Sequence, residues 1–180
     1  GNASKQTRGS LEVPRKVIFI ALGSNLSSDV YGSPQDICEA AIDALQDRGI
    51  SVVARSRWFR TAPVPVSDQP WFVNGVAAVS TGLNPAGLLS VLHEVEAEFG
   101  RTRTLRNEAR ILDLDLIAYD ELVTDGATPP TLPHPRMHER AFVLLPLSDI
   151  APDWRHPATG AALPDLIAAL SAGQRAEPKA

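Results

Sequence analysis

Two carboxylates lie two residues apart in an apolar stretch past the middle of the chain. Asp113 and Asp115 fall within Arg110–Ile117, where leucines occupy the alternate positions. This alternation predicts a β-strand whose successive side chains point to opposite faces, so both carboxylates share one face. At about 3.3 Å per residue, their Cα atoms lie roughly 6.5–7 Å apart. Carboxylates this close repel unless a proton or cation separates them, and Mg²⁺ is a dication that takes such oxygen ligands.

Arginines gather directly before the carboxylate pair. Four of them fall within ten residues, at Arg101, Arg103, Arg106 and Arg110. A guanidinium offers paired donors to phosphate oxygens and keeps its charge. Cations beside a dicarboxylate indicate a site for a polyphosphate bridged by metal ions. The alternatives are an edge strand with a solvated polar face and a solvated basic loop.

Two further groups suit a nucleotide and a flat ring. His134 and Arg140 add donors for phosphate or ribose, although a helix entry with surface charges explains them equally well. Phe72 and Phe142 can enclose a flat heterocycle between their rings. The Asn74 amide offers both a donor and an acceptor to the edge of such a ring. For the two phenylalanines, the alternative is an ordinary place in the core.

Composition and charge limit the class of protein. The 180 residues suffice for one domain with a real core. A net charge of −4 and a pI of about 5.5 argue against a nucleic-acid binder that works through bulk charge. No apolar run reaches the roughly 18 residues of a membrane span. We therefore expect a protein that binds neither nucleic acid nor membranes, and we expect it to be a monomer.

The single cysteine and the polar N-terminus bear on location. Cys38 is the only cysteine, so no intrachain disulfide forms, which indicates a reducing, cytoplasmic compartment. Its helical surroundings favour a buried packing residue over a nucleophile. Residues 1–15 lack the apolar core of a signal peptide, and we expect them to be a tail outside the fold, disordered or left over from expression. Residues 16–175 are then a single domain.

Hydrophobic periodicity predicts alternating strands and helices. Expected strands cover residues 16–22, 50–59, 71–80 and 110–117. A first helix begins at Pro34 with Ser33 as N-cap and stops at Gly49, and a second has Asn84 as N-cap and ends at Gly100. A third runs over 137–145 up to Pro146, and a weak one over 163–170.

The order βαββαβ predicts an α+β fold of the ferredoxin-like type. In that fold an antiparallel sheet carries both helices on one face, and here a C-terminal helical extension follows. We expect the opposite face to stay open and to hold the ligand.

Six short motifs in order resemble one family, the 6-hydroxymethyl-7,8-dihydropterin pyrophosphokinases of folate biosynthesis. They span about residues 16 to 155 and fit the family's spacing. The motifs are Ala21–Leu26, Phe59–Pro63, Gln69–Asn74, Gly100–Arg103, Arg110–Asp115, and Pro133–His134 with Arg140–Phe142.

The resemblance implies transfer of the diphosphate of ATP to the hydroxymethyl group of the pterin, with release of AMP. It implies that Asp113 and Asp115 hold two Mg²⁺ ions and that Arg101 and Arg110 are catalytic. The residues implied for ATP are His93, Glu96, Arg103, Arg106, His134 and Arg140. Those implied for the pterin pocket are Thr61, Ala62, Val64, Phe72, Asn74 and Phe142.

The chain departs from some members of that family at several places, one of them Thr104, where a lysine can occur. The segment from Arg101 to Arg110 is one residue shorter, and Asn107–Ala109 replaces a frequent Trp-Gly-Pro run. His93 stands where glutamine is common, and Pro135 where tyrosine is common.

Two other functions share parts of this pattern. A nucleotidyltransferase also joins a Gly-Ser turn to two aspartates, but close together in sequence, whereas Gly23 lies about ninety residues before Asp113. A non-catalytic ferredoxin-like RNA-binding module needs exposed aromatics on a basic sheet, which the acidic pI opposes. Incubation with ATP, Mg²⁺ and the hydroxymethyl pterin distinguishes the three functions. A pyrophosphokinase releases AMP, a nucleotidyltransferase releases pyrophosphate, and a binding module gives no turnover.

Overall fold

An antiparallel sheet of six strands forms the centre of the part of the chain that the computed structural model describes, residues 17–100 and 111–179. The elements in chain order are β1 (Ile18–Ser24), α2 (Pro34–Asp47), β2 (Ser51–Arg55), β3 (Phe59–Thr61), β4 (Phe72–Ser80), α3 (Pro85–Gly100), β5 (Asp113–Tyr119), the 3₁₀ turn η1 (Met137–Glu139), α4 (Ala141–Ile150), α5 (Leu163–Ala168) and β6 (Ala176–Pro178).

The strand order is β5-β1-β4-β3-β6. Strand β3 pairs with the start of β4, and β2 pairs with its end. Each recorded pairing is antiparallel. Strand β1 is buried over its whole length because it lies between β4 and β5. The order of the main strands and the two crossing helices confirm the ferredoxin-like prediction.

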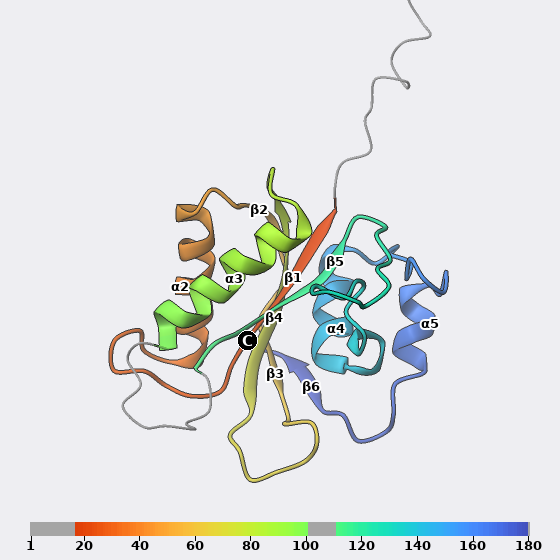
Figure 1. The fold of residues 1–180 in the computed structure, drawn as a ribbon. Coiled ribbons are helices and arrows are strands. Elements are labelled where there is room, and N and C mark those ends of the chain that lie inside the picture. The colour runs from red at the N-terminus through yellow and green to blue at the C-terminus, as the bar shows by residue number, and fades with distance from the viewer. Residues whose placement is uncertain (1–16, 101–110, 180) are drawn as a thin grey trace, which may run out of the picture.

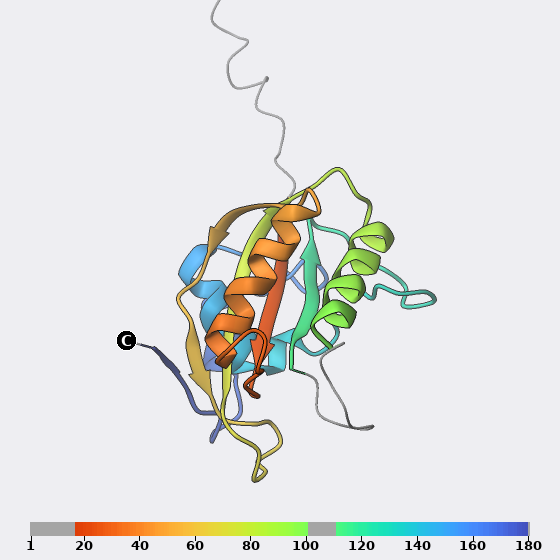
Figure 2. The ribbon, with the colours of Figure 1, turned by 90° about the vertical axis from the view of Figure 1, so that its left-hand side faces the viewer.

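Helices α2 and α3 cover one face of the sheet (Figures 1 and 2). Helix α2 begins as predicted, because the Ser33 side chain accepts from the N–H of Asp36 and the Asp36 carboxylate accepts from the N–H of Ser33. Gly49 follows its end with φ of +82°, a conformation that glycine adopts without a steric penalty.

The leucines of β5, together with Leu112 just before it, point into the core beneath these helices. Leu112, Leu114 and Leu116 are at most 4% exposed and pack with Leu22 of β1 and Leu92 of α3. The two aspartates therefore face the other side of the sheet, as the alternation predicted.

The expectation that the other face stays open is wrong. Helices α4 and α5 cover part of it, and they build a second core that includes Phe19, Val76 and Leu144 (Figure 1). Apolar side chains on both faces of β1 and β4 need a cover on both sides, and the C-terminal helices supply the second one.

The predicted helix over 137–145 differs in two ways. The chain forms the turn η1, breaks at Arg140 in an extended conformation (φ −117°, ψ 111°), and then starts α4. Pro146 lies inside α4 rather than ending it. Proline removes one backbone donor from the helix, but burial of the helix against the second core outweighs that cost.

The strand predicted over 50–59 is two strands, β2 and β3. Ser56, between them, donates its N–H to the Val76 carbonyl and accepts the Val76 N–H on its hydroxyl. The Trp58 ring packs over Gly75, where an added Cβ would lie 2.6 Å from the ring. The Val76 N–H thus bonds to a side-chain hydroxyl instead of a backbone carbonyl, which interrupts the backbone ladder between β2 and β3.

Cys38 is fully buried in the first core, as expected for a packing residue. Burial, and then the charges of Glu39 and Asp113, raise the pKa of its thiol to about 12. Since the thiolate is the nucleophilic form, this thiol is inert at neutral pH. No helix within residues 17–100 and 111–179 is long and apolar enough to cross a membrane.

Helix α4 is tied to the sheet by one ion pair with three hydrogen bonds. The Asp149 carboxylate accepts from the backbone N–H of Arg57 at 2.9 Å and from its guanidinium at 3.0 and 3.1 Å. Hydrogen bonds from Arg57 lower the pKa of Asp149 below its usual value.

We expect Asp149→Asn to destabilise the protein at pH 7 and to have less effect near pH 3. The pKa of the Asp149 carboxyl is lower in the folded state than in the unfolded state, so its ionised form stabilises the fold at pH values above the usual aspartate pKa of about 3.9. This stabilisation is lost as the pH falls through the folded-state pKa. Unfolding midpoints at both pH values measure the difference, with the exposed Asp153→Asn as control. Equal losses at both pH values would contradict this linkage.

Candidate active site

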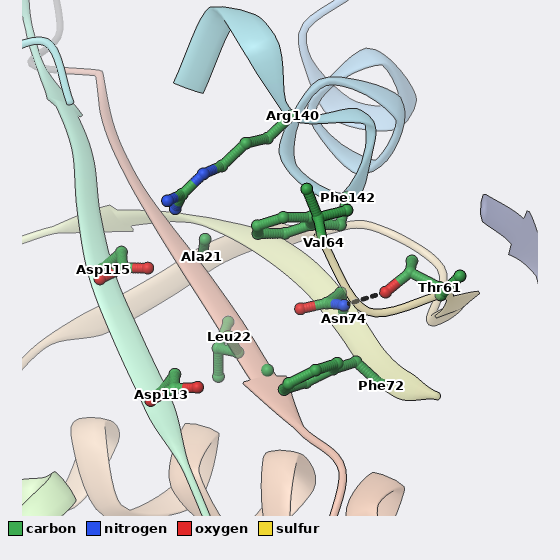
Figure 3. Close-up of a pocket in the computed structure, with 12 residues that line it drawn as sticks. Ala21, Leu22, Thr61, Val64, Phe72, Asn74, Asp113, Asp115, Arg140 and Phe142 are labelled. Atoms are coloured by element: carbon green, nitrogen blue, oxygen red, sulfur yellow. Dashed lines mark hydrogen bonds between the residues drawn. The ribbon is translucent and has the colours of Figure 1, made fainter. Parts of the chain in front are cut away.

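A cavity opens between the sheet, the start of α4 and the loop after β3 (Figure 3). All six residues predicted for the pterin pocket line it, together with both aspartates and Arg140. The lining residues are Ala21, Leu22, Gly23, Thr61, Ala62, Val64, Phe72, Asn74, Asp113, Asp115, Arg140 and Phe142. Residues from four strands, one loop and one helix thus meet at one site.

Strand β1 forms the floor of this cavity and sets its width. Gly23 pairs with Asp113 on one side and with Asn74 on the other, so these three residues form one row across the sheet. Neighbouring strands lie about 4.8 Å apart, which separates the Asp113 and Asn74 backbones by roughly 10 Å. That spacing puts the amide and the carboxylates on opposite sides of β1 at the cavity floor.

Gly23 has a steric function that the sequence analysis did not assign. A Cβ at this position would lie 2.5 Å from Oδ1 of Asn74, so only glycine lets the amide lie over β1. A glycine inside an otherwise apolar strand was the available signal, because such glycines often mark a close approach by another group.

Asn74 is held by a buried partner. Its Nδ2 donates to Oγ1 of Thr61 at 2.5 Å, and the two residues are 7% and 2% exposed. Strand pairing sets this contact, since Phe59–Thr61 runs beside the start of β4. Because the amide is already fixed, its remaining hydrogen-bonding groups can bind a ligand in the cavity without a further loss of side-chain entropy.

Two aromatic rings stand on opposite sides of the cavity with a gap between them (Figure 3). Phe72 comes from the start of β4 and Phe142 from the first turn of α4, and both are only half-buried. Partial exposure at a cavity wall favours the pocket interpretation over the alternative of two ordinary core residues.

Arg140 reaches across the cavity toward the aspartates (Figure 3). Its extended backbone turns the side chain out of the helix, and Cζ lies 5.3 Å from the centroid of the Phe142 ring. The resemblance implied an ATP contact, and the structure places this guanidinium between the aromatic wall and β5. A cation on a ring face gains electrostatic attraction and keeps its planar donors free for an anion.

A second hollow follows the outer edge of β5, between α3 and the segment after residue 129. It contains three of the residues that the resemblance implied for ATP. The lining residues are Leu89, His93, Glu96, Leu114, Asp115, Leu116, Pro130, Thr131, His134 and Pro135. Asp115 lines both this hollow and the first cavity, so the two sites meet at its carboxylate.

His134 is held by its backbone and by its ring. Its N–H donates to the carbonyl of Ile117, the extra residue at a bulge in β5, and its Nδ1 accepts from the N–H of Arg136. Burial lowers the pKa of the imidazole, the nearby Asp115 charge opposes this, and Arg140 and Arg136 add to the lowering. The ring is therefore neutral at pH 7, and its Nε2 is the remaining donor.

Glu96 contacts the strand that carries the aspartates. Its Oε2 accepts from the backbone N–H of Leu114 at 2.8 Å. Because β5 is the edge strand, this donor points away from β1 and would otherwise face the hollow. Glu96 thus fixes the backbone between Asp113 and Asp115, in addition to lining the predicted ATP site.

The donor set of the two aspartates suits Mg²⁺. Within residues 17–100 and 111–179 no group of three or more His, Cys, Asp or Glu side chains could hold a metal ion by itself. Two carboxylates on one strand fit an ion that takes its other oxygen ligands from phosphates and water. Arg101, Arg103, Arg106 and Arg110 lie outside the described residues, and their roles stay predictions.

We expect Glu96→Ala to speed amide hydrogen exchange at Leu114 by about 10- to 100-fold, because hydrogen bonds to charged groups contribute ~1.5–3 kcal/mol. Glu96→Gln keeps an acceptor and should change the rate much less. Exchange followed by NMR gives both rates, with the core amide of Leu22 as internal reference. An unchanged rate at Leu114 in Glu96→Ala would disprove this contact.

Comparisons with known protein sequences identify the family of the chain. The sequence model described as "7,8-dihydro-6-hydroxymethylpterin-pyrophosphokinase (HPPK)" matches residues 19–152. A 2-amino-4-hydroxy-6-hydroxymethyldihydropteridine pyrophosphokinase from Pseudomonas aeruginosa is 44% identical over 155 residues, 84% of this chain and 90% of the relative. One of the same name from Methylorubrum extorquens is 42% identical over 137 residues, 75% and 82% of the two chains.

Solved structures agree at the level of the fold. A crystal structure of a Plasmodium falciparum HPPK-DHPS triple mutant with SDX-DHP superposes with a TM-score of 0.65 at 14% identity. The match covers 90% of this chain and 45% of that one, so this chain spans less than half of its length. The chain is a member of the 7,8-dihydro-6-hydroxymethylpterin-pyrophosphokinase family.

Proposed function

We propose that the chain transfers the diphosphate of ATP to the hydroxymethyl group of 6-hydroxymethyl-7,8-dihydropterin, with release of AMP, in folate biosynthesis. Family membership and the names of relatives at 44% and 42% identity support this reaction. We assign the pterin to the cavity over β1 and the ATP to the hollow along β5.

One observation carries this assignment to the cavity: the row of Asn74, Gly23 and Asp113 across the sheet. It joins an amide that is suited to the edge of a heterocycle to carboxylates that are suited to a metal–phosphate group. The space between them, walled by Phe72 and Phe142, fits a flat ring. The pterin's hydroxymethyl group would then point toward β5, where the diphosphate arrives.

The chain's own residues contribute position and charge. Asn74, fixed by Thr61, orients the pterin edge, and the two rings exclude water from its faces. Arg140 and the neutral His134 supply donors on either side of Asp115, where ATP phosphates would lie. Holding both substrates in line removes much of the entropy cost of their reaction.

Asp113 and Asp115 are the residues that would hold two Mg²⁺ ions. When bound, the ions neutralise phosphate charge and polarise the reacting oxygens. We assign to Arg101 and Arg110 the role of stabilising the negative charge that develops on the phosphate oxygens in the transition state. Arg103 and Arg106 are assigned to ATP binding, as are His93 and Glu96.

The acidic pI of about 5.5 supports small-molecule substrates over nucleic acid. The single, buried Cys38 supports a reducing, cytoplasmic compartment, and a monomer remains the expectation. The sequence distance that argued against a nucleotidyltransferase does not separate Gly23 from Asp113 in space, because the two residues pair. Family membership decides against that alternative instead.

The reaction is tested by incubating the chain with ATP, Mg²⁺ and the hydroxymethyl pterin. AMP should form in a one-to-one ratio with the pterin diphosphate. Pyrophosphate in place of AMP would favour the nucleotidyltransferase, and no turnover would contradict the proposal.

We expect Asp115→Ala to lower kcat by roughly a thousandfold, because metal-ion stabilisation of a transition state is worth several kcal/mol. Circular dichroism should show an intact fold, since this carboxylate faces the cavity rather than a core. The exposed Glu121→Ala, just past β5, is the matched control and should keep wild-type turnover. Full activity of Asp115→Ala would refute the metal assignment.

We expect Gly23→Ala to raise the pterin KM by about 10- to 100-fold, because its methyl group displaces the Asn74 amide and overpacking typically costs ~1–3 kcal/mol. The KM for ATP should change little. Gly82→Ala is the control, since a Cβ there meets nothing within 4 Å. An unchanged pterin KM in Gly23→Ala would contradict the assignment of the pterin to this cavity.

A further inference from the structure

The last residues of the chain contact two walls of the cavity from outside. Residues 171–178 follow the part that the family sequence model matches, which ends at residue 152. In Figure 1 this segment returns from α5 to the edge of the sheet beside β3. Its contacts with the cavity walls were not predicted from the sequence.

The first wall is the strand and loop that carry Thr61 and Ala62. Strand β6 pairs with β3, with Thr61 opposite Ala176, and the N–H of Ala62 donates to the carbonyl of Arg175 at 2.9 Å. The Arg175 guanidinium also lies over the Trp71 ring, with Cζ 4.7 Å from its centroid. This segment therefore covers the otherwise open edge of β3.

The second wall is the start of α4, which the Gln174 carboxamide holds. Its Oε1 accepts from the N–H of Ala141 at 2.8 Å, and its Nε2 donates to the carbonyl of Glu139 at 2.8 Å. Nε2 also donates to Oγ of Ser171 at 3.1 Å. The two backbone groups belong to the residues directly before and after Arg140, so one amide holds both flanks of that residue.

Helix α4 lacks a cap from its own sequence. Arg140 stands at the N-cap position and makes no side-chain hydrogen bond to the helix start. The first N–H groups of a helix need acceptors from elsewhere, and an N-cap residue normally supplies one. Gln174 supplies that acceptor from 33 residues away.

Holding both flanks of Arg140 fixes the direction of two cavity side chains. The extended backbone at Arg140 sends its guanidinium across the cavity, and Phe142 follows in the first turn of α4. Without the carboxamide, the Glu139 carbonyl and the Ala141 N–H lose their shared partner. The break before α4 is then held by the bond from the Arg140 N–H to the Met137 carbonyl at 3.2 Å, so its backbone and the aromatic wall are less firmly fixed.

We propose that Gln174 is a positioning residue for the pterin pocket, acting through the backbone on either side of Arg140. This inference rests on the assignment of the pterin to the cavity. Gln174 does not line the cavity, so its effect on the substrate passes through Arg140 and Phe142. The C-terminal segment is then part of the site's architecture, together with the sheet.

Gln174→Met tests this role, because methionine keeps the length of the side chain and removes both hydrogen bonds to the backbone as well as the one to Ser171. We expect the pterin KM to rise about fivefold with kcat unchanged, the fold-change that corresponds to the ~1 kcal/mol of a typical helix N-cap. A purely structural role gives a different result. Loss of folded enzyme lowers the apparent kcat and leaves the KM unchanged.

Glu177→Ala is the matched control in the same segment. Its ion pair with Arg60 is exposed and does not contact α4, so the pterin KM should stay at the wild-type value. A wild-type KM in Gln174→Met, or an equal rise in Glu177→Ala, would overturn the inference.

Gly23→Ala separates this inference from the proposed function. If Gly23→Ala raises the pterin KM and Gln174→Met does not, the pocket assignment stands and the role of Gln174 is wrong. If Gly23→Ala leaves the KM unchanged, the pocket assignment itself is wrong. A rise in both variants, with Glu177→Ala unchanged, supports both.

Discussion

The antiparallel pairing of β1 with β4 and β5 is the constraint on which the site depends. It places Gly23 between Asp113 and Asn74, residues that are 39 positions apart in the sequence. A slip of one residue in either ladder would turn the affected side chains to the opposite face. The leucines of β5 prevent that slip, because it would move them from the first core into the cavity. Core packing and site geometry are therefore fixed by the same register.

The sheet serves two cores, and the cavity lies where the second core ends. Helices α2 and α3 cover one face, whereas α4 and α5 cover the other (Figures 1 and 2). Near the start of α4, the break at Arg140 replaces an apolar cover with a cation and an aromatic wall. The cavity is thus a consequence of where a helix begins. Its shape depends on the groups that hold that beginning in place.

Backbone groups at the edge of the sheet are used to position side chains. The outward N–H of Leu114 is taken by Glu96, and the carbonyl of Ile117 is taken by the N–H of His134. An edge strand would otherwise leave these groups to water or to another strand. Both contacts connect the hollow along β5 to the strand that carries the aspartates. Two backbone groups of the edge strand are thereby paired, one before Asp115 and one after it.

The local sequence pattern alone determined several features of the fold and of the site. Alternation in β5 placed the aspartates on one face, capping residues placed the start of α2, and short motifs indicated the family and the pocket residues that the cavity brings together. Tertiary structure alone decided the break of the 50–59 strand, the continuation of α4 through Pro146, the cover on the second face and the contacts of Gln174. These features arise from residues that are distant in sequence and meet only after folding. Periodicity and capping report the local backbone, and they carry no information on such partners.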